Sequence, residues 1–145
     1  MTRPDYTPDA VRTLARLSRL LERGAGELSL PQFRVLAMVE DGGDRASWLA
    51  DRLALAKPTI TALVDVLVDR GYLTRTADDG DRRVTRIALT QRGRRALEAS
   101  EAAMAERLGE VLAQTADSAA VVWAINELGS GLDRMRAKRL AGERA

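Results

Sequence analysis

The side chains best placed to do chemistry are three aspartates, Asp78, Asp79 and Asp81, which surround a glycine and are followed directly by Arg82 and Arg83. Clustered carboxylates suggest a calcium loop, but the EF-hand spacing and its bidentate glutamate are absent here. An Asp-Gly pair is instead typical of the turn of a β-hairpin. We therefore predict a solvated turn that carries two arginines and binds no metal.

Other reactive groups are missing from the sequence. The 145 residues include no cysteine and no histidine. This excludes disulfides, cysteine or histidine zinc sites, and Cys–His or Ser–His catalytic pairs. No carboxylate pair stands in a recognisable motif with a nucleophile or base, so we expect neither an enzyme nor a bound cofactor. The sequence has no apolar run long enough for a membrane span or a signal peptide, which predicts a cytoplasmic protein.

The distribution of charge gives the first indication of a partner. Residues 45–95 contain 11 basic and six acidic side chains, a net charge of +5, while the remainder carries −3. Of the 23 basic residues in the chain, 21 are arginine, the side chain best suited to bidentate contacts with phosphate or guanine. A basic centre on a nearly neutral chain favours nucleic-acid binding. The alternative is a compositional bias, because the whole chain is rich in alanine and arginine.

Hydrophobic periodicity predicts six helices and one hairpin. Apolar residues at helical spacing indicate helices over about 8–23, 30–41, 48–53, 57–70, 91–115 and from 118 onward. Two-residue alternation indicates strands at 72–76 and 84–89. Residues of the types that favour helix N-caps precede four of these helices, namely Ser29, Ser47, Thr90 and Asp117.

Two short helices joined by a tight turn and followed by a hairpin have the order of a winged helix-turn-helix. In helix 57–70, Ile60, Leu63, Val64 and Leu67 form one apolar face. The polar residues near the start of this helix lie off that face, where short side chains could approach base edges in a major groove. The alternative is an ordinary amphipathic helix beside a solvated charged loop.

Residues 81–93, DRRVTRIALTQRG, resemble the wing signature of MarR-type transcriptional regulators, which reads D-R-R, an apolar strand, then L-T-x-x-G. Residues 28–36, 49–53, 57–67 and 70–75 resemble the preceding helices of that family. The resemblance implies a mainly α fold with a small β-wing, in a single protomer over 1–145. Its winged helix-turn-helix lobe would cover 29–93, and its dimerisation helices would cover 5–24 and 94–140.

The resemblance and the residue pattern together predict the DNA contacts. Those predicted are Ser47, Lys57, Pro58, Thr59, Thr61, Arg75, Arg82 and Arg83. Asp65 lies on the same helix, and an unpaired carboxylate there would be repelled by phosphate. The family pairs the matching aspartate with the second arginine of D-R-R, so the resemblance implies an Asp65–Arg83 salt bridge that braces the wing.

The resemblance also implies a homodimer on a pseudo-palindromic operator. Apolar residues of the first and last helices would form its interface, namely Val11, Leu14, Val121, Ile125, Leu128, Leu132 and Met135. The last five are spaced by 4, 3, 4 and 3 residues, a heptad seam.

Members of the family are usually repressors that small phenolic or other aromatic ligands release. The candidates for lining a ligand pocket are Arg16, Leu20, Phe33, Leu36 and Trp48. The other interpretation of these five is ordinary core and surface. The absence of cysteine and histidine excludes the peroxide and zinc sensing found in some members. A DNA-binding protein without an effector, constitutive or architectural, is the main alternative, and a pure interaction module is the third.

Overall fold

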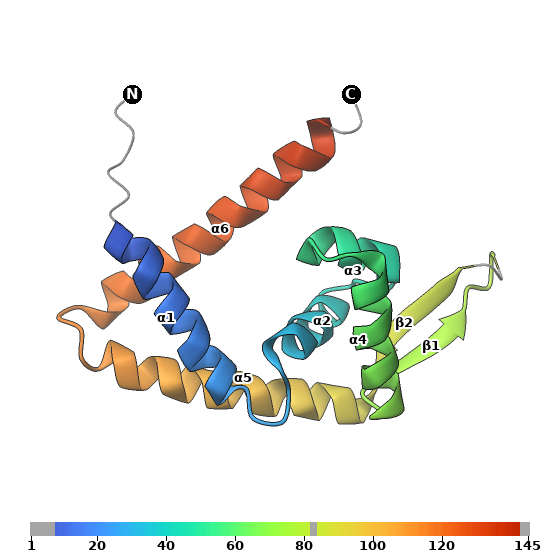
Figure 1. The fold of residues 1–145 in the computed structure, drawn as a ribbon, viewed down its shortest axis with the longest axis horizontal. Coiled ribbons are helices and arrows are strands. Elements are labelled where there is room, and N and C mark those ends of the chain that lie inside the picture. The colour runs from blue at the N-terminus through green and yellow to red at the C-terminus, as the bar shows by residue number, and fades with distance from the viewer. Residues whose placement is uncertain (1–7, 82–83, 143–145) are drawn as a thin grey trace. The chain divides into compact units, whose positions relative to one another are not determined.

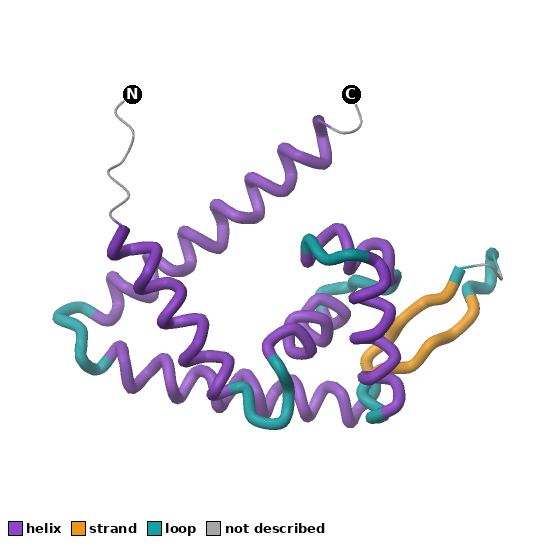
Figure 2. The backbone as a smooth tube through the Cα atoms, in the orientation of Figure 1, coloured by secondary structure: helices purple, strands orange, loops and turns teal. Residues whose placement is uncertain are grey.

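The computed structural model describes residues 8–81 and 84–142. These residues form mostly helix with one two-stranded antiparallel sheet (Figures 1 and 2). The contacts divide the chain into two compact units, residues 1–107 and 108–145. The elements are α1 (Pro8–Gly24), α2 (Leu30–Glu40), α3 (Ala46–Leu53), α4 (Lys57–Asp69), β1 (Leu73–Ala77), β2 (Thr85–Leu89), α5 (Gln91–Leu112) and α6 (Ser118–Gly142). This mainly helical fold with a small β-wing is the predicted fold class.

The hydrophobic core of the first unit lies where α2, α3, α4 and the start of α5 meet. Leu36, Leu49, Ile60 and Leu97 each come from a different one of these helices, and each is fully buried. In Figure 1, α3 and α4 lie beside each other and the hairpin extends beyond α4. The core therefore holds the helix-turn-helix pair rigidly, because each helix contributes a fully buried aliphatic side chain.

The buried side chains of the hairpin are few. In the antiparallel register Leu73 lies opposite Leu89 and Arg75 opposite Ile87. Leu73 and Ile87 are buried, while the other side chains of β1 are exposed. The strands begin and end within one residue of the predicted limits. Arg82 and Arg83, predicted at the tip of the hairpin, lie outside the described residues.

Three of the four predicted helix caps are confirmed. The Ser29 hydroxyl accepts the Gln32 amide at 3.3 Å, while the Gln32 side chain accepts the Ser29 amide at 3.0 Å, a complete capping box. Thr90 Oγ1 accepts the Gly93 amide at 2.9 Å, and Asp117 Oδ1 accepts the Ala120 amide at 3.0 Å. Short polar side chains thus start α2, α5 and α6 where the sequence places them.

The fourth cap, Ser47, was predicted wrongly. The N-cap of α3 is Arg45, which has extended backbone and makes no side-chain capping bond, so Ser47 lies inside the first turn. The cause is a non-local contact: the carbonyl of Asp44 accepts the amide of Ile87 in β2 at 2.7 Å. This pairing holds the chain extended only as far as Arg45, and the helix begins directly after it.

Helix α5 ends at Leu112, about three residues before the predicted end near Thr115. The Thr115 hydroxyl donates to the carbonyl of Leu112 at 2.7 Å, and the Thr115 amide donates to the same carbonyl at 3.0 Å. Threonine competes in this way with the regular helical bond, which favours a tight turn.

Helix α6, in the second unit, runs unbroken through Gly129 and Gly131 and has no fully buried residue in its described part. Its apolar side chains are exposed by 58–70% at Trp123, Leu128, Leu132 and Met135. Leu128, Leu132 and Met135 lie on one side of α6, whereas Trp123 lies on the other. An exposed apolar row of this kind is typical of an interaction surface. Among the described helices, none is long and apolar enough to cross a membrane.

Candidate nucleic-acid interface

Helix α4 presents two different faces. Ile60, Val64 and Leu67 are completely buried in the core of the first unit, whereas Lys57 and Thr61 are exposed. Thr59 is exposed as well, and Pro58 occupies the first turn, where its missing amide costs no hydrogen bond. Within the described residues Lys57 takes part in no ion pair. The predicted division of this helix into a core face and a short polar outer face is confirmed.

The hydroxyl of Thr61 has a defined orientation. It donates a hydrogen bond to the carbonyl of Lys57 at 3.0 Å, one turn earlier in α4. Its proton is therefore engaged, and the group offers an acceptor lone pair and a methyl group to solvent. These groups match a base amine and the methyl group of thymine, so Thr61 can discriminate between bases without a long side chain.

Asp65 is paired with an arginine of the wing. Its Oδ1 lies 2.6 Å from Nη2 of Arg75 in β1, with 50% and 36% of the two side chains exposed. This bridge joins α4 to the hairpin, the role that the resemblance implied for Arg83. Because Arg83 lies outside the described residues, the Asp65–Arg83 pair stays a prediction. Arg75, predicted as a DNA contact, holds a carboxylate in this structure.

Four charged residues, Asp44, Arg45, Asp78 and Arg86, form a network that we call the wing joint. Arg86 donates through Nε to Asp78 Oδ2 at 3.1 Å, and its Nη1 contacts Asp44. Arg45 Nη2 lies 3.7 Å from Asp78 Oδ2. The Gly80 amide, together with Arg86 and Arg45, holds the pKa of the Asp78 carboxyl below its ordinary value. These contacts therefore favour the charged form of the Asp78 carboxyl.

Sequence reasoning missed the wing joint, although one part of it carried a signal. The register places Thr76 opposite Arg86, so Asp78 is the diagonal neighbour of Arg86 on the same face of the hairpin. A correct hairpin alignment would have suggested this pair. Asp44 and Arg45 lie about 40 residues away in sequence, and no local pattern connects them to the wing.

A second polar cluster holds the C-terminal end of α4. Arg70, the C-cap of α4, donates to the carbonyl of Glu27 at 3.2 Å and to Gln32 Oε1 at 3.3 Å. The hydroxyl of Tyr72 donates to Glu27 Oε1 at 2.8 Å. These bonds fasten the recognition helix to the segment that precedes α2, so Arg70 is a structural cation.

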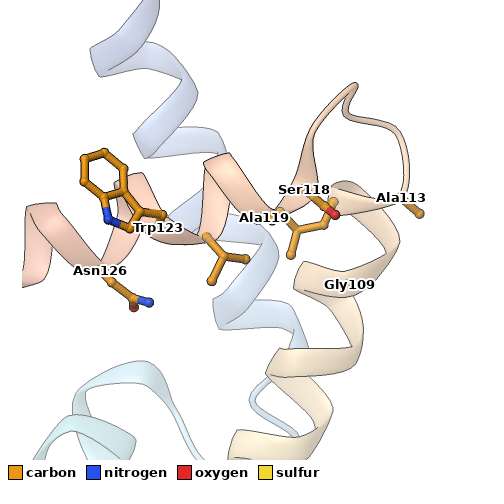
Figure 3. Close-up of a pocket in the computed structure, with 8 residues that line it drawn as sticks. Gly109, Ala113, Ser118, Ala119, Trp123 and Asn126 are labelled. Carbon is orange, nitrogen blue, oxygen red and sulfur yellow. The ribbon is translucent and has the colours of Figure 1, made fainter.

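None of the five candidates for a ligand pocket lines either of two hollows in the described residues, so these candidates stay a prediction. Leu36 is fully buried in the core, and Phe33 and Trp48 pack against it, which corresponds to the alternative interpretation of these residues. Arg16 is exposed and Leu20 half-buried on α1. An open, mostly apolar groove of about 640 Å³ lies instead within the second unit, and none of the five lines it. Figure 3 shows Trp123 and Asn126 of α6 on one side of it and the end of α5 on the other.

Comparison with known proteins identifies the first unit. Residues 27–84, which include all of α4 and every residue of the wing joint except Arg86, match the model of the MarR family. The chain is 34% identical over 73 residues to the uncharacterized HTH-type transcriptional regulator YpoP of Bacillus subtilis (strain 168), an alignment that covers 50% of the chain. The chain thus spans about half the length of this curated relative, 52%.

Solved structures extend the similarity to most of the chain. Wild-type MarR from E. coli aligns with a TM-score of 0.74 and 20% identity, over 87% of this chain and 97% of the other. A probable transcriptional regulator from Pseudomonas aeruginosa gives 0.67 and 28%, over 90% and 97%. CouR from Rhodococcus jostii RHA1, solved with p-coumaroyl-CoA, gives 0.71 and 23%, over 92% of each chain.

The family model covers α2, α3, α4 and β1, and these structural alignments cover 87–92% of the chain. YpoP and the Pseudomonas aeruginosa protein are transcriptional regulators by description. Residues 27–84 thus match the MarR family of transcriptional regulators, and the chain shares the fold of wild-type MarR.

Proposed function

We propose that the chain binds duplex DNA at specific sequences, with α4 in the major groove and the wing on the adjacent backbone, and thereby represses transcription. The observation that carries this proposal is the outer face of α4. Lys57, Thr59 and Thr61 are exposed there, while the opposite face is completely buried. A short polar surface on a rigidly held helix is what close approach to base edges requires.

The DNA-binding form in this proposal is a homodimer. Leu128, Leu132 and Met135 leave 58–70% of their side chains exposed along one face of α6, and Val11 and Leu14 of α1 are exposed by 63% and 54%. A second copy of the chain would cover such surfaces with matching ones, because a two-fold interface is self-complementary. The two α4 helices would then enter successive major grooves, about 34 Å apart.

A small effector forms the finer part of the proposal. A regulator of the same fold, CouR, was solved bound to p-coumaroyl-CoA, which supports an aromatic or phenolic ligand that releases the DNA. The second candidate is DNA binding without an effector. It is favoured by the position of Leu36, which was expected to line a pocket and is fully buried. Thermal shift with phenolic acids and their CoA thioesters, followed by DNA release, separates the two.

The proposed function predicts strongly salt-dependent binding. We would select duplexes from a random pool with the wild-type protein and measure their affinity as ionic strength rises. If a dimer contacts 6–10 phosphates, its affinity should fall by about 10³–10⁵-fold between 50 and 200 mM salt. Failure to enrich any sequence, or an affinity that salt leaves unchanged, would contradict the proposal.

Thr61 should determine base choice at one position of each half-site. Thr61→Val keeps a methyl group and removes the acceptor, so it should reduce discrimination there by about 1–3 kcal/mol and leave affinity for unselected DNA unchanged. Competition between single-base variants of the selected duplex measures this. Thr13→Val, at an exposed position of α1, is the matched control. Equal base preference in wild type and Thr61→Val would remove Thr61 from the interface.

A further inference from the structure

The wing joint connects three segments of the first unit. Asp78 follows β1, Arg86 lies in β2, and Asp44 and Arg45 directly precede α3. Arg86 uses all three of its side-chain nitrogens here: Nε and Nη2 lie 3.1 and 2.9 Å from Asp78 Oδ2, and Nη1 contacts Asp44. All three nitrogens of this guanidinium thus lie against carboxylates of the protein, so Arg86 supports the wing joint from within.

Backbone bonds reinforce the same connection. The Ile87 amide donates to the Asp44 carbonyl at 2.7 Å, and the Asp78 amide donates to the Val84 carbonyl at 2.9 Å. Asp78 also accepts the Gly80 amide through Oδ1 at 3.1 Å, and only 17% of its side chain is exposed. The Asp78 carboxylate thus contacts Arg86 of β2 and Arg45 in the approach to α3.

The charges of the joint argue against a simple electrostatic role. Two aspartates and two arginines sum to zero, so the joint adds no net attraction for DNA. Its carboxylates lie in a basic region that is proposed to face phosphates, where each is unfavourable unless it has another purpose. Orientation is such a purpose, since the direction of the wing decides which part of the DNA backbone it reaches.

We propose that Asp78 is a positioning residue for sequence-specific DNA binding: through Arg86 it fixes the wing relative to α3 and α4. This inference rests on the proposed function. The inference gives the arginines of the region different roles. Arg86 supports the wing from within the protein. Arg45, with 47% of its side chain exposed and 3.7 Å from Asp78, is held only loosely.

An electrostatic role and a positioning role of Asp78 predict opposite changes in affinity for the selected duplex, and the test uses this difference. Asp78→Asn removes a negative charge beside the proposed DNA surface. Electrostatics alone predicts equal or tighter binding, whereas loss of positioning predicts binding to the selected duplex that is weaker by on the order of tenfold. Binding to an unselected duplex of the same length should not weaken. Faster hydrogen exchange at the Ile87 amide should accompany the change.

Asp79→Asn is the matched control, because it removes the same charge one residue away, at an exposed position. It should bind both duplexes at least as tightly as the wild type. Arg86→Lys is a second variant that keeps the charge, but an ammonium cannot hold both carboxylates as a guanidinium does. It should lose selectivity as Asp78→Asn does, with the far-UV circular dichroism of a folded protein.

Three outcomes would overturn the inference. In the first, Asp78→Asn binds as tightly as Asp79→Asn, or Arg86→Lys binds as the wild type does. In the second, the loss is the same on selected and unselected duplexes, which indicates general affinity and not positioning. In the third, the wild-type protein enriches no sequence. Only the third also refutes the proposed function, so the two failures are distinguishable.

Discussion

Replacing Gly93 with alanine should destabilise the first unit by about 3 kcal/mol or more, the range of severe overpacking. An added Cβ would lie 2.0 Å from the carbonyl oxygen of Tyr72 and 2.8 Å from its carbonyl carbon. That carbonyl cannot move away easily, because it accepts the Thr90 amide at 3.0 Å and the Thr90 hydroxyl at 3.2 Å. Alanine would therefore separate α5 from the base of the wing. Urea unfolding at fixed protein concentration measures the loss.

Gly109 in the same helix provides the control. Among the described residues, no atom beyond its chain neighbours and the backbone of its own helix lies within 4 Å of the position that its Cβ would take. Gly109→Ala should therefore stabilise α5 by up to about 1 kcal/mol. If Gly93→Ala lowers the free energy of unfolding and Gly109→Ala raises it, then the close approach of Tyr72, and not helix propensity, accounts for Gly93. If both variants were stabilised equally, the contact between α5 and Tyr72 would have to be looser than it is here.

These glycines show what the sequence could predict of the fold. The L-T-x-x-G pattern located Gly93, and the Thr90 cap within it follows from local chemistry alone. What the pattern could not reveal is the reason for the glycine, because Tyr72 approaches it from a different element. The same limit explains Ser47. Its residue type favours a cap, but the Asp44–Ile87 backbone bond sets where α3 begins.

The candidate site, too, was predictable from the sequence only in part. The outer face of α4 was predictable, because burial of every third or fourth residue fixes where Lys57, Thr59 and Thr61 point. The partners of the charged side chains were not, since several arginines could reach any one carboxylate. Asp65 lies with Arg75, and Asp44 with Arg86. Only the register of the hairpin and the path of the loop before α3 decide between such candidates.

A charge placed in the seam of α6 should abolish both the dimer and tight operator binding. Leu128 is 58% exposed and lies in the middle of the heptad seam, so Leu128→Asp puts two carboxylates at a two-fold interface. Burying them unpaired is costly enough to separate the chains. A lone protomer then contacts one half-site without the second, which should weaken binding to the full site by about 10²–10⁴-fold. Sedimentation velocity and binding to full and half sites measure the two effects.

Ala137→Asp is the matched control for this seam. Ala137 is exposed on the same helix and lies half a turn away from the row that contains Leu128, so its aspartate should remain in water. It adds the same charge to the same helix, and it should leave the dimer and the affinity for the full site unchanged. A Leu128→Asp protein that stays dimeric would place the interface on another surface. A monomer that still binds the full site tightly would show that one winged lobe suffices.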